Sequence, residues 1–346
     1  MTAHDFKDTA CNFGHSDAEL ASTPQSDGTS SPAPRRYDER MTFRDTLAML
    51  ALSAAWGASF LFLHVAAPVV GPVAVAAIRV SSATILLLPL VLWRGDIGHL
   101  RTHAVPMLAC GMLAFGLPFI CLSLATRHLP AGLMSILNAT TPMWGAFIGW
   151  VWLKERMHLM RSLGLVLGLA GVILLTFDKG TMPSSEKSLG AVLLMLCATL
   201  SYALAVNVAR RHLHRLSPLT SATGTLCMTM LVMAGPALWL GPQPMPSIDV
   251  HAWRDVPAAV WAALLTLGMV CTGLAQIVFF QLIGRIGPNQ ALTVTFLIPV
   301  FGMLWGALFL HEHVTAWMLM STAIIALGTW LANRPAVASP PKPTQV

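Results

Sequence analysis

One positively charged side chain stands deep inside an apolar stretch of this sequence. Arg79 lies in the middle of GPVAVAAIRVSSATILLLPL, where a guanidinium among lipid tails would cost at least ~2.5–3.5 kcal/mol. Such a group must therefore face a cavity or a polar partner. Two roles are open for it: a clamp for a bound carboxylate or phosphate, and a structural donor to backbone carbonyl oxygens at a helix break.

Aromatic and small polar side chains recur in other apolar stretches, a combination that orients small ligands in largely apolar pockets. Those that we expect to line a pocket together with Arg79 are Trp56, Ser59, Phe60, Asn138, Thr141, Tyr202, Asn207, Gln276 and Thr295. Plain packing is the competing explanation for the aromatic residues. For the polar residues it is interhelical hydrogen bonding, which is worth only about 0.6 kcal/mol on average. Their spread over several stretches favours a shared cavity.

Acidic residues are confined to the ends of the apolar stretches. Between residues 46 and 334 they are Asp96, Glu155, Asp178, Glu186, Asp249, Asp255 and Glu312. A buried carboxylate proton relay is therefore not expected. A coupling proton, if the protein uses one, would have to involve His64, His128 or one of these acids.

Metal and cofactor chemistry has little support. The HEH sequence at 311–313 invites a metal site, but consecutive helical residues do not share a face. The six cysteines show no metal-ligand spacing, and we expect free thiols that pack as small hydrophobes. We therefore predict no metal, no cofactor and no catalytic residue.

The composition places the chain among integral membrane proteins. Hydrophobic residues make up 55%, charged residues 10%, and the mean hydropathy is +0.67, whereas about a quarter of residues are charged in ordinary soluble proteins. A spanning helix needs roughly 20 mainly apolar residues. Stretches of this kind lie at about 46–66, 71–93, 104–125, 129–153, 159–177, 188–209, 219–240, 256–282, 288–310 and 315–332. They are too continuously apolar for transmembrane β-strands, so we predict an all-α integral membrane protein with ten transmembrane helices.

Both ends of the chain differ from this membrane region. Residues 1–45 are rich in Ser, Thr, Pro and Asp, and 333–346 are similarly polar, so we expect two disordered tails. No apolar stretch precedes Thr46, which argues against a cleaved signal peptide. The net charge of +6 does not indicate nucleic acid as a partner, because the basic residues are scattered among span ends. The lipid bilayer is the expected partner.

The distribution of Lys and Arg predicts the orientation in the membrane. If both termini are cytoplasmic, sixteen of the 21 lie on the cytoplasmic side, and Arg79 lies within a span. The opposite side receives Arg127, Lys179, Lys187 and Arg254. An excess of positive charge on the cytoplasmic side is what the positive-inside rule requires. We therefore predict a multi-pass protein of the cytoplasmic (inner) membrane with both termini inside.

The sequence also contains an internal repeat. The segment PMWGAFIGWVWLKE (142–155) returns 157 residues later as PVFGMLWGALFLHE (299–312), and its shared glutamate is significant because the chain holds only five. The copies are five spans apart and hence run in opposite directions, so Glu155 lies inside and Glu312 outside. We predict two inverted five-helix halves, 46–177 and 188–332, joined by a connector at 178–187. Inverted repeats with a binding site between them are typical of secondary transporters.

The repeated segment supplies the expected scaffold and hinge residues. A proline removes a helix hydrogen bond and should kink its helix, glycines four residues apart let helices approach closely, and the glutamates should tie down helix ends. The residues with these roles are Pro142, Gly145, Gly149, Glu155, Pro299, Gly302, Gly306 and Glu312.

Several segments in this order resemble a known family. They are GPVAVAAIRVSSATILLLPL, PMWGAFIGWVWLKERM with PVFGMLWGALFLHEHV, and GLVLGLAGVILL with STAIIALGTWL. Together, over residues 46–332, they resemble the EamA-type family of the drug/metabolite transporter superfamily. The resemblance implies a ten-helix inner-membrane carrier that exports amino acids or other small metabolites.

From the resemblance and the repeat we expect a secondary transporter that exports a small amphipathic metabolite by alternating access, as a monomer or homodimer. An importer remains open, because nothing in the residues determines the direction. A membrane-embedded enzyme would need acids, bases or metal ligands that converge at one face, and the sequence has no such set. A sensor would need a signalling domain, for which the N-terminal tail is too short and polar.

Overall fold

The structure, a computed structural model, describes residues 42–95, 97–151, 159–176, 186–291 and 293–332. These residues form helices and connecting loops without any strand. In the first part of the chain the helices are α2 (Phe43–Val70), α3 (Pro72–Trp93), α4 (Ile97–Thr102), α5 (Ala104–Gly111), η1 (Met112–Gly116), α6 (Leu117–Ala125), α7 (Ala131–Asn138), α8 (Thr141–Val151) and α9 (Leu159–Thr176). They are followed by α10 (Glu186–His212), α11 (Pro218–Leu240), η2 (Trp253–Asp255), α12 (Ala258–Leu265), η3 (Thr266–Leu274), α13 (Ala275–Ile286), α14 (Pro288–Ala291), α15 (Val294–Leu310) and α16 (Ala316–Ala332).

Many of these helices are long and apolar enough to cross a membrane. Six reach the necessary length, counting α5–η1–α6 and α12–η3–α13 as continuous helices: Phe43–Val70, Pro72–Trp93, Ala104–Ala125, Lys187–His212, Pro218–Leu240 and Ala258–Ile286. Shorter apolar helices are Leu159–Leu175, Val294–Leu310 and Ala316–Ala332. The described residues thus confirm the predicted all-α class, and these helices have the length and composition of membrane spans.

The predicted span at 129–153 is broken in the structure. Helix α7 ends at Asn138 and α8 begins at Thr141, with hydroxyl hydrogen bonds from Thr140 to the Leu137 carbonyl and from Thr141 to the Asn138 carbonyl, both 2.8 Å. Pro142 is the second residue of α8, where its missing N–H costs no helical bond. The break thus precedes Pro142, whereas Pro299 lies inside α15.

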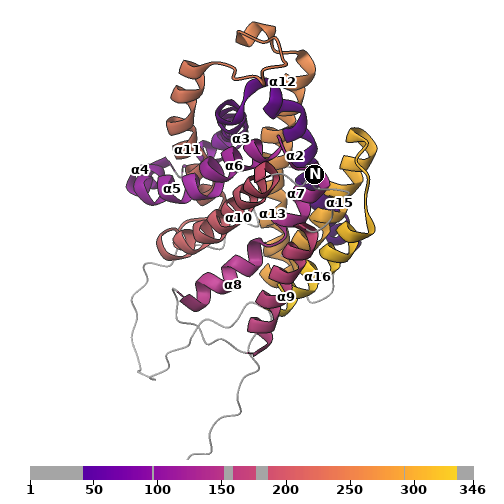
Figure 1. The fold of residues 1–346 in the computed structure, drawn as a ribbon. Helices are drawn as coiled ribbons and strands as arrows, with labels where there is room; N and C mark the ends of the chain where they lie inside the picture. Colours follow the sequence, from indigo (N-terminus) through magenta and orange to yellow (C-terminus); the bar gives the residue numbers. More distant parts are fainter. Residues whose placement is uncertain (1–41, 96, 152–158, 177–185, 292, 333–346) are drawn as a thin grey trace, which may run out of the picture. The chain divides into compact units, whose positions relative to one another are not determined.

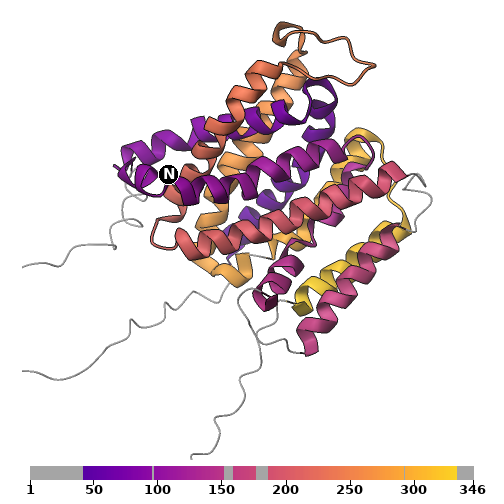
Figure 2. The same ribbon diagram turned by 60° about the vertical axis from the view of Figure 1, so that its left-hand side comes forward.

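The helices pack in pairs that join distant parts of the sequence. Helix α9 lies along α16, α2 along α15, α3 along α11, and α10 along α6. The α9–α16 pair is visible in both ribbon views (Figures 1 and 2). Close approach there depends on small residues: a Cβ on Gly328 would lie 2.5 Å from the Gly168 backbone nitrogen, a distance that real Cβ atoms do not reach.

Two of the long helices contain π-helical segments. Segment η1 interrupts Ala104–Ala125, and η3 interrupts Ala258–Ile286. Near the start of each, a glycine packs against a neighbouring helix. A Cβ on Gly111 would strike Thr229 of α11, and a Cβ on Gly268 would strike Ser82 of α3. π-Helical segments occur frequently at functional sites.

Contacts between helix ends define two ends of the bundle. At one, the Arg285 side chain at the end of α13 lies 3.7 Å from the Asp45 carboxylate at the start of α2. At the other, the Glu312 carboxylate contacts the first residues of α7. We refer to them as the Asp45 end and the Glu312 end. The backbone N–H of Gln243 bonds the carbonyl of Val70 over 3.1 Å, so α11 finishes at the Glu312 end and starts, at Pro218, at the Asp45 end.

The glycines of the repeated segment do not all behave as predicted. A Cβ on Gly302 would strike Ser135 of α7, and one on Gly306 would strike Glu312, so both glycines allow close contacts. Gly145 is different, because a Cβ there would meet nothing within 4 Å. The described residues therefore show no close helix approach at Gly145. Glu155, predicted to tie down a helix end, lies outside the described residues.

Candidate functional site

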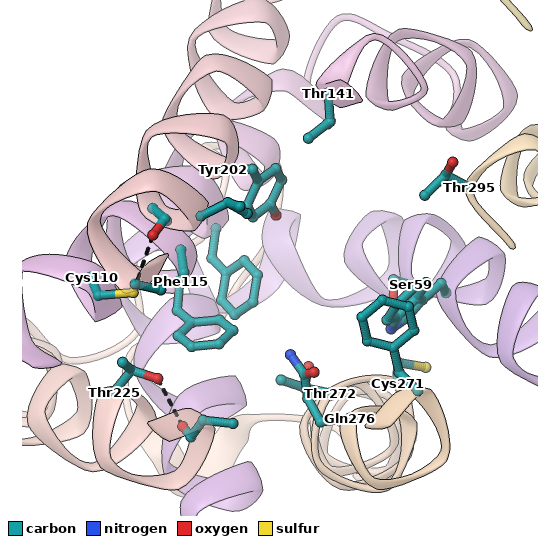
Figure 3. Close-up of a pocket in the computed structure, with 18 of the residues that line it drawn as sticks. Ser59, Cys110, Phe115, Thr141, Tyr202, Thr225, Cys271, Thr272, Gln276 and Thr295 are labelled. Atoms are coloured by element: carbon teal, nitrogen blue, oxygen red, sulfur yellow. Dashed lines mark hydrogen bonds between the residues drawn. The ribbon is translucent and has the colours of Figure 1, made fainter. Parts of the chain in front are cut away.

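A cavity of about 740 Å³ lies among the helices, within the range of small-molecule sites. Its wall is built from residues of α2, α3, the α5–η1–α6 helix, α7, α8, α10, α11, the η3–α13 helix and α15. Figure 3 shows this space, with Tyr202 and Phe115 on one side of it and Ser59 and Cys271 on the other. Both parts of the chain that share the internal repeat contribute to the wall.

Most of the residues predicted from the sequence share this cavity. Those that line it are Trp56, Ser59, Phe60, Arg79, Asn138, Thr141, Tyr202, Gln276 and Thr295. Asn207 does not, and its amide donates instead to the carbonyl of Ala203 over 2.9 Å. The physical reason is helical phase: five residues advance an α-helix by about 140° beyond a full turn, so Tyr202 and Asn207 cannot face the same space.

Arg79 is anchored by three different helices. Its Nε donates a hydrogen bond of 2.8 Å to the hydroxyl of Thr272 in η3, and Nη2 approaches the hydroxyl of Ser59 in α2 at 3.5 Å. The guanidinium carbon lies 3.8 Å from the centroid of the Phe119 ring in α6, a cation–π contact. Its hydrogen-bond acceptors are therefore side-chain hydroxyls rather than backbone carbonyl oxygens at a helix break.

The π-helical geometry of η3 prepares Thr272 for this contact. The Thr272 hydroxyl donates to the carbonyl of Leu267, five residues earlier, over 2.9 Å. Because its single proton is used there, the oxygen presents a lone pair to Arg79. The backbone of η3 thus fixes the direction in which Thr272 accepts, and through it the position of the guanidinium.

Part of the guanidinium remains unused by the protein. Arg79 is only 6% exposed and carries five N–H donors, yet its hydrogen bonds involve Nε and Nη2 alone. Within the described ranges, Nη1 has no hydrogen-bond partner and no carboxylate forms an ion pair with Arg79. A buried cation of this kind needs an anion or water to be stable.

Several lining residues were not predicted from the sequence. They are Phe115, Phe119, Thr225, Cys271, Thr272 and, at the rim, Arg210. Thr272 is separated from Arg79 by 193 positions, and nothing in its local sequence distinguishes it from other threonines. The internal repeat contains a signal for the region of Thr272. The shift of 157 residues aligns Gly-Met at 111–112 with Gly-Met at 268–269, and Gly-Leu at 116–117 with Gly-Leu at 273–274. These matches mark both π-helical segments.

The cavity reaches the surface at one end of the bundle. Arg210 and Pro218, at the Asp45 end, are exposed and belong to its wall. In the other direction the wall finishes at Phe60, Leu122 and Ile298, which are all buried. Among the described residues, the wall is thus exposed toward the Asp45 end and buried toward the Glu312 end, and we refer to these as the open and the closed end of the cavity.

Polar contacts hold the closed end together. The Glu312 carboxylate accepts hydrogen bonds from the first two backbone N–H groups of α7, where the helix dipole favours negative charge. His64 contacts the segment that precedes α7. Its ring nitrogens lie 2.9 Å from the carbonyl oxygen of Phe60 and 2.8 Å from that of Leu129. His311 adopts left-handed backbone geometry, with φ of 55°, and so turns the chain after α15 toward α7.

Metal and disulfide chemistry gain no support from the described residues. Among them, no three His, Cys, Asp or Glu side chains gather where they could hold a metal ion. Cys110, Cys121, Cys197, Cys227 and Cys271 are free thiols. The cavity wall is thus a binding surface made of aromatic rings, hydroxyls, amides and a guanidinium.

Comparison with known proteins gives a consistent result. The model of the EamA-like transporter family matches residues 45–177 and again 189–334. An uncharacterized transporter from Bacillus subtilis, YvbV, is 26% identical over 290 residues, covering 84% of this chain and 92% of the relative. A probable terminal-alkyne amino-acid exporter from Streptantibioticus cattleyicolor is 23% identical, covering 83% and 92%.

Two further matches extend the comparison. A probable amino-acid metabolite efflux pump from Salmonella typhimurium is 22% identical and covers 84% of this chain and 95% of the relative. A solved crystal structure of a protein matches with a TM-score of 0.57 and 18% identity, over 85% of this chain and 97% of the other. That likeness concerns the fold alone.

Proposed function

Because the chain belongs to the EamA-like transporter family, we propose that it is a secondary transporter of the cytoplasmic membrane that exports small metabolites, such as amino acids or related amphipathic compounds, by alternating access. The single observation that carries this proposal is the cavity between the two repeated parts of the chain, open at one end and closed at the other. It is a multi-pass membrane protein of a transporter family, and two of its relatives are named as a probable terminal-alkyne amino-acid exporter and a probable amino-acid metabolite efflux pump.

The packing of the helices supports two inverted five-helix halves. The repeat pairs α3 with α11 and α9 with α16, and each of these pairs is in contact. It also pairs η1 with η3, where Gly111 packs on α11 and Gly268 packs on α3. If the two halves exchanged their conformations, each of these contacts would therefore be replaced by its equivalent in the other half. Two such halves have two arrangements of similar energy, as alternating access requires.

The predicted orientation gives the observed state a direction. Under the positive-inside rule the Asp45 end is cytoplasmic, and the exposed arginines at 210, 211 and 215 lie at this end. The cavity would then be open to the cytoplasm and closed to the outside by the contacts of Glu312 and His64. This is the state in which an exporter loads its substrate.

Transport would follow from binding in the cavity. Arg79 would attract a negatively charged group, while the aromatic rings cover the apolar part of the substrate. Opening the Glu312 end and closing the Asp45 end would then release the substrate outside. No described carboxylate lines the cavity, so a coupling proton would have to use a group such as His64. A single chain contains the whole cavity, and a monomer would suffice.

The test is flux through purified protein in liposomes loaded with a panel of metabolites. We expect saturable movement of at least one compound, inhibited by an excess of the same compound, and none in protein-free liposomes. Absence of movement for the whole panel in both directions would contradict the proposal. Reversing the gradient, together with release from overproducing cells, distinguishes export from import, which is the closest alternative.

A further inference from the structure

We propose that the substrate is an organic anion, a carboxylate attached to an apolar and partly aromatic body, without a free ammonium group. This inference rests on the proposed transport function and narrows the class of substrate. Amino acids carry an ammonium group as well as a carboxylate, so the inference disfavours them. It is drawn from the distribution of charge in the cavity wall.

The charged residues of the wall have one sign. Two arginines line the cavity, Arg79 in its depth and Arg210 at its open end, and none of the described lining residues is Asp or Glu. The sequence agrees, because no acidic residue between 46 and 334 lies within a span. A carboxylate is attracted by both arginines, whereas an ammonium is repelled by both and finds no counter-charge.

The position for the carboxylate is set by Arg79. Thr272, Ser59 and Phe119, from three different helices, contact the guanidinium, and Nη1 is left without a hydrogen-bond partner among the described residues. A guanidinium that is held in place and lacks part of its hydrogen bonds is pre-organised for an anion, because little side-chain freedom is lost on binding. The hydroxyls around it are neutral acceptors and do not neutralise its charge.

The remainder of the wall suits an apolar body. Its aromatic members are Trp56, Phe60, Phe115, Phe119, Tyr202, Phe279 and Phe280. Trp56 and Phe279 form a tilted pair with ring centroids 5.3 Å apart, and aromatic side chains of this kind cover apolar and aromatic ligands well. The amides of Asn138 and Gln276 offer hydrogen bonds to neutral polar substituents.

Arg210 adds a second element at the open end. It is exposed, so its charge is screened and contributes more to the rate of encounter than to affinity. Arg211 is also exposed, directly follows it in the chain and does not line the cavity. The two neighbours therefore form a matched pair for a test of steering.

The experiment compares substrates that share a body and differ in charge. Binding and liposome flux are measured for 3-phenylpropionate, phenylalanine and phenethylamine, and for the equivalent triplets with an indole and with a branched aliphatic body. We expect the carboxylate of a triplet to bind and move best, the amino acid at least about tenfold less well, and the amine not at all.

Two results would overturn the inference and are distinguishable from each other. Equal or better transport of the amino acids would refute the anion preference and leave the transport function intact. Failure of every member of all triplets, in a preparation that also moves no compound of the broader metabolite panel, would refute the transport function as well.

Variants test the role of the two arginines. Arg79→Gln should weaken carboxylate binding by about thirtyfold or more, as expected when one partner of a buried charge pair is lost. Arg79→Lys keeps the charge and should retain part of the preference for the carboxylate over the amino acid, which a merely structural arginine would not explain. Arg210→Ala should slow uptake at low salt more than Arg211→Ala does, and equal effects would remove Arg210 from the proposal.

Variants that misfold are identified separately. Thermal unfolding in detergent is compared for each variant and the native protein. If Arg79→Gln is unstable, Thr272→Val displaces the guanidinium while keeping its charge, and it should still lower carboxylate affinity. Unchanged affinity in a folded Thr272→Val protein would contradict the proposed carboxylate position.

Discussion

The carboxylate of Glu312 accepts a hydrogen bond of 2.6 Å from the backbone N–H of Ala131, the first residue of α7. Its second oxygen accepts one of 2.9 Å from Gly132. The contact joins positions 181 residues apart and combines hydrogen bonding with the favourable end of a helix dipole. It lies at the closed end of the cavity, so its strength contributes to the stability of the closure.

Replacing Glu312 by Gln should loosen this closed end. The substitution removes the charge and one of two acceptors, a loss of about 0.5–2 kcal/mol by comparison with helix caps, which shifts an open–closed equilibrium by about twofold to thirtyfold. The measurement is labelling of Cys271, which lines the cavity, by an impermeant maleimide from outside, in a variant with no other cysteine. Labelling should rise in Glu312→Gln and stay constant in Asp249→Asn, whose carboxylate is in an exposed loop. Equal labelling in all three proteins would refute a closing role for Glu312.

Thr272→Val should destabilise the fold more than Thr84→Val. Both threonines are buried, at 4% and 1% exposed, and both donate to a carbonyl of their own helix. Only Thr272 also accepts from Arg79, and an unsatisfied buried donor costs about 1–3 kcal/mol. Thermal unfolding of the purified variants in detergent measures the difference. Equal midpoints would mean that the Arg79–Thr272 contact contributes nothing to stability.

Gly268→Ala and Gly145→Ala should have opposite effects. A Cβ at 268 would strike Ser82 and lie 2.6 Å from the Arg79 carbonyl oxygen, so we expect a loss of about 1–3 kcal/mol from overpacking. At 145 the Cβ meets nothing within 4 Å, and Ala in place of Gly should stabilise the helix by about 0.5–1 kcal/mol. Thermal midpoints of the two variants test this. A destabilised Gly145→Ala protein would show that α8 contacts another surface.

The orientation is testable independently of transport. A fluorescent protein fused to the C-terminus should fold and fluoresce if that terminus is cytoplasmic. Cysteines introduced at His251, in the loop between α11 and α12, should react with an impermeant reagent in intact cells. Cysteines at His214, between α10 and α11, should react only after the membrane is opened. The reverse pattern would invert the proposed direction of the cavity.

Much of this site could be predicted from types of residue alone. Arg79 is identifiable because an isolated charge inside an apolar span needs a polar environment, and Tyr202 and Gln276 because aromatic and polar groups together suit a largely apolar ligand pocket. The repeat gave the relation between distant segments. These predictions depend on composition and period, which the sequence displays directly.

Other features depended on geometry that the sequence does not display. Asn207 was misplaced because a residue's presence in a span does not give the direction in which it faces. The break between Asn138 and Thr141 lies in an apolar stretch. Hydropathy does not reveal it, because it does not report the hydrogen bonds from threonine hydroxyls to the carbonyls of the preceding helix. Thr272 owes its role to π-helical backbone geometry and to a partner far away in the chain.

The lone buried guanidinium also has an electrical consequence. Among the residues that the structure describes, Arg79 has no equivalent charge in the other half, where the matching contact around Gly111 is made by Thr225 and Thr229. If the chain transports organic anions as proposed, the empty protein would hold the charge of Arg79 within the membrane, and a bound carboxylate would cancel it. The membrane potential would then act on the return of the empty protein rather than on the step that moves the bound substrate. Each exported anion would carry one negative charge out of a cell whose interior is negative. A potential of 100 mV contributes about 2.3 kcal/mol per charge to this outward movement, so export of an anion could be driven by voltage alone.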